Sequence, residues 1–217
     1  SSNQMVGNSY DLGAGLAFVR QSSVPRAPTL VNDGNYGDKL RITINNVSSD
    51  INFPYVSIID DFNITDGPLG ANWSALDTFG KEWTISGNKA LIWSQNNKEG
   101  GDYWNAASFG PDTEVYATIV DPGFVNTEAG LGLRLSSPDS NRSGYNINFS
   151  NTVLVYNRVD SGVSTQIGDT ETIVLSAGNK VGLRIVGNYL QAYMDTGGGW
   201  VAVGTGRTDS TYADAGY

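Results

Sequence analysis

The chain has 217 residues, of which 39% are hydrophobic and 16% charged, so it is long enough to bury a substantial core. It contains no histidine and no cysteine, which excludes imidazole and thiolate metal sites, histidine-assisted nucleophiles and disulfide bonds. The formal net charge of −9 argues against nucleic acids and anionic membranes as partners, because phosphate binding needs a basic surface. No apolar stretch is long enough to span a bilayer, so we expect no membrane insertion.

Residues 1–58 are weakly patterned and rich in Gly, Asn and Ser. Pro25 and Pro28 exclude a helix there and favour an extended run, whereas the alternation over residues 40–44 predicts one strand. We therefore predict an extended arm or a small appended β element over 1–58, ahead of a separate domain over 59–217. The residues expected to form the assembly segment of this arm are Val24, Pro25, Arg26, Pro28 and Leu30.

From Asp60 onward apolar and polar residues alternate repeatedly, and no window shows the periodicity of a helix. Each alternating segment offers one face to a core and the other to solvent or a partner. Turn-forming residues separate these segments, and Gly187-Asn188 is typical of a two-residue hairpin loop. The pattern predicts an all-β, two-sheet antiparallel sandwich. The alternating segments are 115–119, 131–135, 145–149, 154–156, 173–175, 181–185, 189–193 and 200–203.

Two consecutive segments carry a family resemblance: residues 60–73 (DDFNITDGPLGANW) and residues 83–90 (WTISGNKA). They resemble the opening of concanavalin A-like (LamG-like) jelly-roll domains, which occur in bacterial secreted proteins and in bacteriophage virion proteins. The resemblance covers about residues 60–217 and implies a jelly-roll sandwich. The residues of the first segment expected to converge on a core are Phe62, Leu69 and Trp73.

The resemblance also implies something about calcium and about the last strand. Many such domains bind calcium near the sandwich edge, so Asp60 and Asp61 are the residues expected to hold Ca²⁺ if any is bound, and no other cofactor is expected. The final strand of such domains typically follows an A-G-Y-type sequence, and here residues 215–217 end the chain. We therefore expect that strand to be either removed or supplied by another segment, such as residues 16–19, or by a neighbouring chain.

Catalysis is weakly indicated. Glycosidases need two carboxylates flanking the scissile bond, and Asp112-Thr-Glu114 and Asp169-Thr-Glu171 have the spacing that places two acids on one strand face. Neither pair is followed by a third acid, so we expect solvated acids at strand ends. Without histidine, a lyase-type site would depend on Tyr145 with Arg134 and Arg184. We predict no catalytic residues and no enzymatic activity, with a polysaccharide-active enzyme as the third alternative.

Glycan binding makes fewer demands on the sequence. Aromatic rings beside amides or carboxylates form the usual platform for a sugar, and residues 99–105 combine two adjacent aromatics with such groups. Adjacent residues on a strand face opposite ways, so about half of the aromatics should be core. The candidate glycan-binding residues are Trp93, Asp102, Tyr103, Trp104 and Asn105.

These observations favour a non-catalytic structural or adhesion protein on a bacteriophage virion surface, acting in capsid decoration, as a cement or as a tail-associated protein. Its expected partners are other virion subunits, further copies of itself in a homo-oligomer, and cell-surface glycans. The alternative is an extracellular, secreted bacterial lectin or carbohydrate-binding module.

Overall fold

The computed structural model describes residues 53–54, 58–76, 83–92, 101–121, 128–136, 141–214 and 216. The chain separates into two units, Ser1–Tyr55 and Val56–Tyr217, and all strands of the described residues belong to the second unit. The predicted arm with its assembly segment, the strand at 40–44 and Trp93 lie outside the described residues. In the part of the chain that is described, no helix has the length and apolar character needed to cross a membrane.

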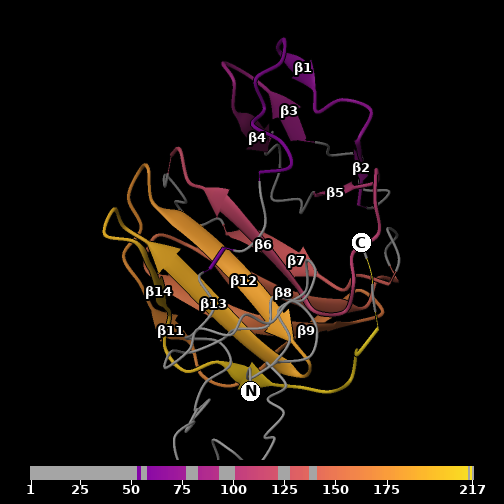
Figure 1. Ribbon diagram of the computed structural model, residues 1–217, viewed down its shortest axis with the longest axis vertical. Helices are drawn as coiled ribbons and strands as arrows, with labels where there is room; N and C mark the ends of the chain where they lie inside the picture. The colour runs from indigo at the N-terminus through magenta and orange to yellow at the C-terminus, as the bar shows by residue number, and fades with distance from the viewer. Residues whose placement is uncertain are drawn as a thin grey trace, which may run out of the picture. The chain divides into compact units, whose positions relative to one another are not determined.

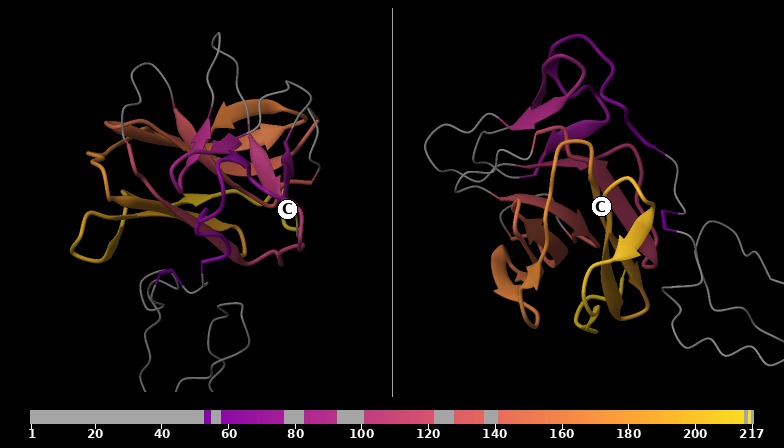
Figure 2. Two further views of the ribbon diagram at one scale, coloured as in Figure 1. Left: turned by 90° about the horizontal axis from the view of Figure 1, so that it is seen from above. Right: turned by 90° about the vertical axis from the view of Figure 1, so that its left-hand side faces the viewer.

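Two five-stranded antiparallel sheets lie against each other as the two layers of a sandwich (Figures 1 and 2), which confirms the predicted all-β, two-sheet fold. We call them sheet I and sheet II. Sheet I has the order β10-β9-β8-β7 with β11 beside β9, and consists of β7 (Ala129–Leu133), β8 (Gly144–Phe149), β9 (Val153–Asp160), β10 (Val163–Gln166) and β11 (Glu171–Thr172). Sheet II has the order β14-β13-β12-β6 with β15 beside β13, and consists of β6 (Thr113–Thr118), β12 (Lys180–Val186), β13 (Tyr189–Asp195), β14 (Trp200–Ala202) and β15 (Arg207–Thr208).

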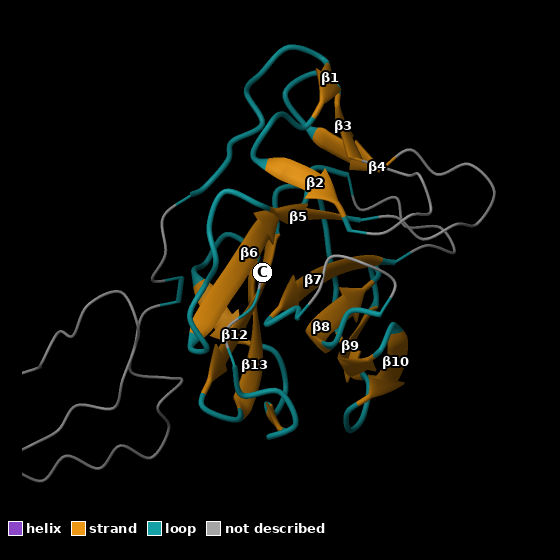
Figure 3. Cartoon of the chain, turned by 90° about the vertical axis from the view of Figure 1, so that its right-hand side faces the viewer, coloured by secondary structure: helices purple, strands orange, loops and turns teal. Residues whose placement is uncertain are grey.

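Two smaller sheets lie at one end of the sandwich (Figure 3). One joins β1 (Gly67–Pro68), β3 (Trp83–Ile85) and β4 (Ala90–Ile92), and the other pairs β2 (Trp73–Ala75) with β5 (Asp102–Trp104). Gly87 and Asn88 connect β3 to β4 with φ angles of 59° and 60°. Positive φ at both central residues is the requirement of a type I′ hairpin turn, which matches the twist of the paired strands.

The core lies between the inner faces of sheets I and II, where the alternating segments predicted from the sequence place their apolar residues. Ile147 of β8 faces Tyr156 of β9 in register, and both have an exposed fraction of 0%. The other core residues are Ile119, Leu133, Tyr145, Phe149, Leu154, Ile173, Leu175, Val181, Leu183, Ile185, Leu190, Ala192 and Val203.

One predicted strand is wrong. Residues 173–175 follow the two-residue strand β11 and are not themselves a strand. The backbone N–H groups of Ile173 and Leu175 donate to the carbonyls of Thr152 and Asn151, in the β8–β9 turn. Both side chains are nevertheless buried. The alternation therefore identified two core residues correctly, although their backbone pairs with a turn and not with a strand.

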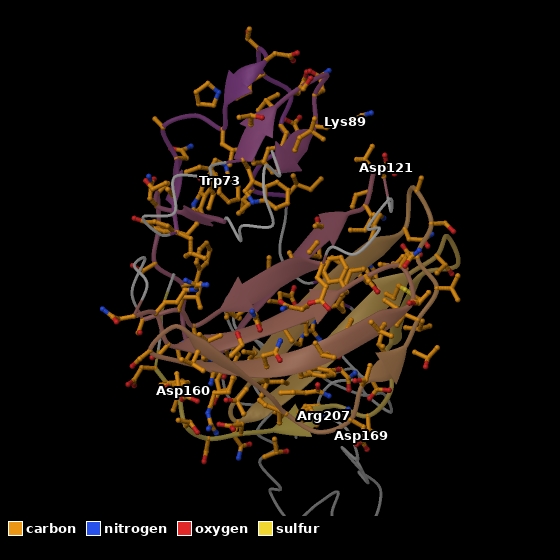
Figure 4. All side chains as sticks on the ribbon, turned by 180° about the vertical axis from the view of Figure 1, so that it is seen from behind. Trp73, Lys89, Asp121, Asp160, Asp169 and Arg207 are labelled. Atoms are coloured by element: carbon orange, nitrogen blue, oxygen red, sulfur yellow. The ribbon has the colours of Figure 1, made fainter. Side chains whose placement is uncertain are left out.

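Arg207 ties β15 of sheet II to the β10–β11 connection of sheet I. Its guanidinium donates to the carbonyls of Ile167 (3.0 Å) and Asp169 (2.7 Å) and to the carboxylate of Glu171 (2.7 Å). The same group lies 4.9 Å from the ring centroid of Tyr156. Arg207 and Asp169 are seen close together at the end of the sandwich away from Trp73 (Figure 4). A planar guanidinium suits this combination of several acceptors and an aromatic face.

Arg134 makes a second connection, and its side chain is almost fully buried. Its guanidinium donates to the carbonyl oxygens of Pro111, Gly187 and Tyr212 at 2.5, 2.7 and 2.8 Å. These carbonyls belong to the approach to β6, to the β12–β13 turn and to the C-terminal segment. One buried side chain therefore joins backbone acceptors from three separate parts of the chain.

Asp209 is the centre of a third set of contacts. Tyr145 donates its hydroxyl to the Asp209 carboxylate at 2.8 Å, and Arg158 pairs with that carboxylate at 3.0 Å. Burial alone would raise the pKa of Asp209, but hydrogen bonds from Thr211, Tyr145 and Arg158 outweigh it and lower this pKa to about 2. The hydroxyl of Tyr145 also accepts the N–H of Tyr212, so the C-terminal segment is held against sheet I.

We predict that Asp209 makes stability fall with acid. In the unfolded chain an aspartate takes up its proton near pH 4, whereas Asp209 in the folded chain takes it up only near pH 2. The unfolded state therefore binds more protons over this interval, and the free energy of unfolding should decrease as the pH falls from about 4 to about 2. Urea unfolding of the wild type and of Asp209→Asn measures this. The variant should lack that part of the decrease, and parallel pH profiles would contradict the assignment.

Candidate functional site

The outward face of sheet I carries a line of amides. Four residues lie side by side across four neighbouring strands, because the register pairs each with the next. Successive strands lie about 4.8 Å apart, so the three amide-bearing residues span about 10 Å. We call this set the amide row. Its members are Gly132 (β7), Asn146 (β8), Asn157 (β9) and Gln166 (β10).

Asn146 is the unusual member of the amide row. Its Oδ1 atom is buried and accepts no hydrogen bond, and no other buried side-chain nitrogen or oxygen among the described residues lacks a partner. Buried polar groups in folded proteins almost always have a partner, and an unsatisfied one costs about 1–3 kcal/mol. The neighbouring Asn157 has an exposed fraction of only 6%, whereas Gln166 is exposed. The row thus contains a buried acceptor without a hydrogen-bond partner.

A glycine on β7 makes room for the Asn148 side chain on the adjacent part of this face. Gly130 lies opposite Asn148, and a Cβ atom at position 130 would come within 2.8 Å of Asn148 Oδ1. That approach is too close for a carbon and an oxygen, so any side chain at 130 would displace the Asn148 amide. Glycine therefore allows a further amide to lie beside the amide row.

The outward face of sheet II has a different character. Gly182 of β12 lies between Tyr116 of β6 and Tyr193 of β13 in register, and Trp200 of β14 contacts the ring of Tyr116. The centroids of Tyr116 and Trp200 are 5.7 Å apart with the planes at 76°, an edge-to-face pair. This aromatic face is a second candidate surface.

A buried ion pair lies on the same face, and it corrects one expectation from the sequence. Glu114 was expected to be a solvated acid, but its carboxylate pairs with Arg184 at 2.6 Å and both side chains are about 3% exposed. Glu171 likewise pairs with Arg207 at 2.7 Å. Each of these acids pairs with an arginine from a distant strand. The spacing of acids along one strand gives no information about such a partner. Asp112 accepts the N–H of Gly187 at 2.7 Å.

The predicted glycan-binding residues 102–105 lie on and just after β5. Trp104 is directly opposite Trp73 of β2, and their rings meet edge to face with centroids 5.4 Å apart. Asp102 accepts the backbone N–H of Trp83 at 2.7 Å, and Tyr103 lies opposite Ser74 on the other face of the ribbon.

Asn105 also has partners within this ribbon, donating its side-chain amide to Ser74 Oγ at 2.6 Å and to the carbonyl of Ala71 at 3.2 Å. The structure thus brings the four described candidates together, with the polar groups of Asp102 and Asn105 bonded to β3, to β2 and to the turn at Ala71. Glycan binding by Trp104 stays a prediction from the sequence, which the Trp104→Ala variant described below tests against the amide row.

The two aspartates expected to hold calcium make local contacts. Asp60 accepts the indole N–H of Trp73 at 2.8 Å and the backbone N–H of Phe62 at 2.7 Å, while Asp61 accepts the N–H of Asn63 at 3.0 Å. Over the described ranges, no three acidic side chains come together in a way that could hold a metal ion. Calcium binding by this pair stays a prediction. The predicted core residue Leu69 is buried, and Phe62 packs against Trp73 with centroids 5.9 Å apart.

The residues of a lyase-type site have structural partners too. Burial raises the pKa of Tyr145 to about 12, which makes its hydroxyl a poor base at neutral pH. Arg134 donates to three backbone carbonyls, and Arg184 pairs with Glu114 on the outward face of sheet II.

Comparison with known proteins gives little beyond the architecture. No protein-family model matches the sequence, and no curated protein sequence matches it. Among solved structures, the carbohydrate-binding module CBM66 from Bacillus subtilis is similar to this chain. The TM-score is 0.47 with 14% sequence identity, over 65% of this chain and 82% of that chain. A likeness at this level assigns no ligand, so the candidate surfaces are argued from their own residues.

We predict that Asn146→Ala leaves the free energy of unfolding within about 1 kcal/mol of the wild type or raises it, because the change removes an unsatisfied buried acceptor. The adjacent substitution Ile147→Ala is the control, since this fully buried core residue should cost about 2–5 kcal/mol. Chemical denaturation of both variants gives the comparison. A large loss of stability in Asn146→Ala would show that the amide serves the fold.

Proposed function

We propose that the protein is a non-catalytic carbohydrate-binding protein and that the amide row on sheet I is its ligand surface. The observation that carries this proposal is the buried, unpartnered Oδ1 of Asn146, in a line of amides on the outward face of a rigid sheet. Sites built on strands hold their groups more accurately than sites on loops. The atom is covered in this conformation, so a ligand reaches it by displacing neighbouring side chains, and it then completes a hydrogen bond that the folded chain leaves unmade.

Sugars suit this surface because of their hydroxyl groups. A side-chain amide offers two donors and an acceptor, and a sugar hydroxyl can both donate and accept. Adjacent strands repeat the amide along the row. The side-chain N–H groups of Gln166 already donate to the carbonyl of Gly168 at 2.9 Å and to Thr170 Oγ1 at 3.2 Å, so this residue would serve a sugar hydroxyl as an acceptor. Gly130 and Gly132 on β7 bring no side chain of their own to the face, and the side chains of Asn148 and Leu135 lie against them there.

The proposal predicts which substitution removes binding. On a glycan array followed by calorimetry, Asn157→Ala should weaken binding by about tenfold, since one or two hydrogen bonds are lost. Trp104→Ala tests the predicted β5 residues and Trp200→Ala tests the aromatic face of sheet II, and both should bind as the wild type does. Loss of binding only in one of these tryptophan variants, with the fold kept, would move the site to that surface. Absence of binding to any glycan would remove the proposed function.

The biological setting that we propose is a bacteriophage virion surface, with a secreted bacterial lectin or carbohydrate-binding module as the alternative. What supports it is the resemblance of residues 60–73 and 83–90 to virion jelly-roll domains, together with the proline-containing residues 1–58 ahead of the sandwich. In this setting residues 24–30 dock on a neighbouring subunit by extended packing or strand addition.

The assembly part of this proposal predicts a change of mass. Light scattering should find a discrete oligomer for the full chain and a monomer when residues 1–58 are removed, because the arm is the docking segment. Equal monomeric masses for both forms would contradict an assembly role and leave the secreted lectin as the better setting.

A further inference from the structure

We infer that the amide row takes an uncharged sugar chain laid across the strands of sheet I, and that it discriminates against acidic polysaccharides. This inference rests on the proposed function and narrows it to a chemical class of ligand. The strand register places amide side chains on this face and places no charged side chain among its paired residues, and the inference follows from both facts.

The strands around the row bring no charge to this face. The described residues paired across this face of β7, β8, β9 and β10 include no acidic and no basic side chain. Arg158 and Asp160 of β9 alternate to the inner side, and Arg134, which follows β7, is buried. Glu128 and Arg142 precede the paired residues of β7 and β8 and so lie at the ends of the face. The residues on the face are Gly130, Gly132, Gly144, Asn146, Asn148, Val155, Asn157, Val159, Ser164 and Gln166.

This composition disfavours an anionic ligand. A carboxylate or sulfate can only accept hydrogen bonds, and proteins bind such groups with arginine or lysine. On this face the group would lose its water without gaining a cation, and it would place acceptors against the oxygen of Asn146. The chain's net charge of −9 adds repulsion at long range. A neutral sugar hydroxyl meets neither penalty, and it can donate to the Asn146 oxygen where the side chains that cover this atom move aside.

The direction of the row favours a sugar chain that crosses the strands. The row runs perpendicular to the strands, because each member is the register partner of the next. The spacing of strands is close to the length of one sugar residue, so a chain laid across them meets one amide at each residue. A chain along a strand would instead meet Asn146 and Asn148 on β8 but Val155 beside Asn157 on β9. The crossing direction therefore gives the larger number of amide contacts.

The experiment uses the full chain and two sets of soluble polysaccharides. The neutral set is dextran, mannan, inulin and hydroxyethylcellulose, and the anionic set is polygalacturonate, alginate and heparin. Affinity electrophoresis and calorimetry at low and high NaCl should show binding to at least one neutral polymer, nearly independent of salt, and none to the anionic set. With oligosaccharides of the bound polymer, affinity should rise with length until the chain spans the row.

Variants connect that binding to the row. Asn146→Ala and Asn157→Ala should each weaken neutral-polymer binding by about tenfold. Asn63→Ala, the same change at an exposed loop residue, is the matched control and should bind as the wild type does. Circular dichroism and melting temperature report folding, and the Asn146 variant keeps the test valid if the buried Asn157 proves necessary for folding.

The outcomes distinguish failure of this inference from failure of the proposed carbohydrate-binding function. Binding to an anionic polymer that weakens with salt overturns the inference and leaves carbohydrate binding in place. Neutral binding that neither row variant affects also overturns it, and moves the site elsewhere on the chain. Failure to bind any polymer or any glycan on the array overturns the proposed function together with the inference.

Discussion

The register of β8 against β9 decides what each face of sheet I carries. Ile147 faces Tyr156 on the inner side, while Asn146 faces Asn157 on the outer side. Because side chains alternate with a period of two, a shift by one residue would exchange the two sets. The core would then receive amides and the outward face would receive large apolar side chains. The amide row and the hydrophobic core are therefore two results of one pairing.

Contacts at different points along β9 hold this register. At its end, Ser161 and Gly162 have φ angles of 47° and 84°, which is the geometry of a two-residue type I′ turn into β10. In the middle, the Tyr156 hydroxyl accepts the N–H of Ala192 at 2.8 Å. Ala192 lies on β13 between the residues that pair with β14 and those that pair with β15. Burial raises the pKa of Tyr156 to about 12, so the hydroxyl stays neutral. A slipped β9 would lose this bond to the opposite sheet.

The sequence pattern was sufficient for the strands and the core but not for the polar contacts between distant segments. Alternation identified β8 and the buried Ile147 correctly, because burial of one face imposes it. It also placed Ile173 in a strand, although that backbone pairs with a turn. Glu114 was expected in solvent because its partner Arg184 is 70 residues away, and only the β6–β12 register joins them. The amide row could not be predicted from the sequence for the same reason, because only the pairing of β8, β9 and β10 places Asn146 and Gln166 in one line.

The two outward faces of the sandwich differ in whether their buried polar groups have partners. On sheet II, Glu114 and Arg184 neutralise each other at 2.6 Å, so the charges are satisfied within the fold. On sheet I, Asn146 keeps a buried oxygen without a partner, at a cost that an alanine or valine would avoid. A folded chain of marginal stability retains such a cost where a ligand removes it, because binding energy then includes the hydrogen bond that folding left unmade. The unsatisfied atom, more than any resemblance, is the reason that we propose sheet I as the ligand surface.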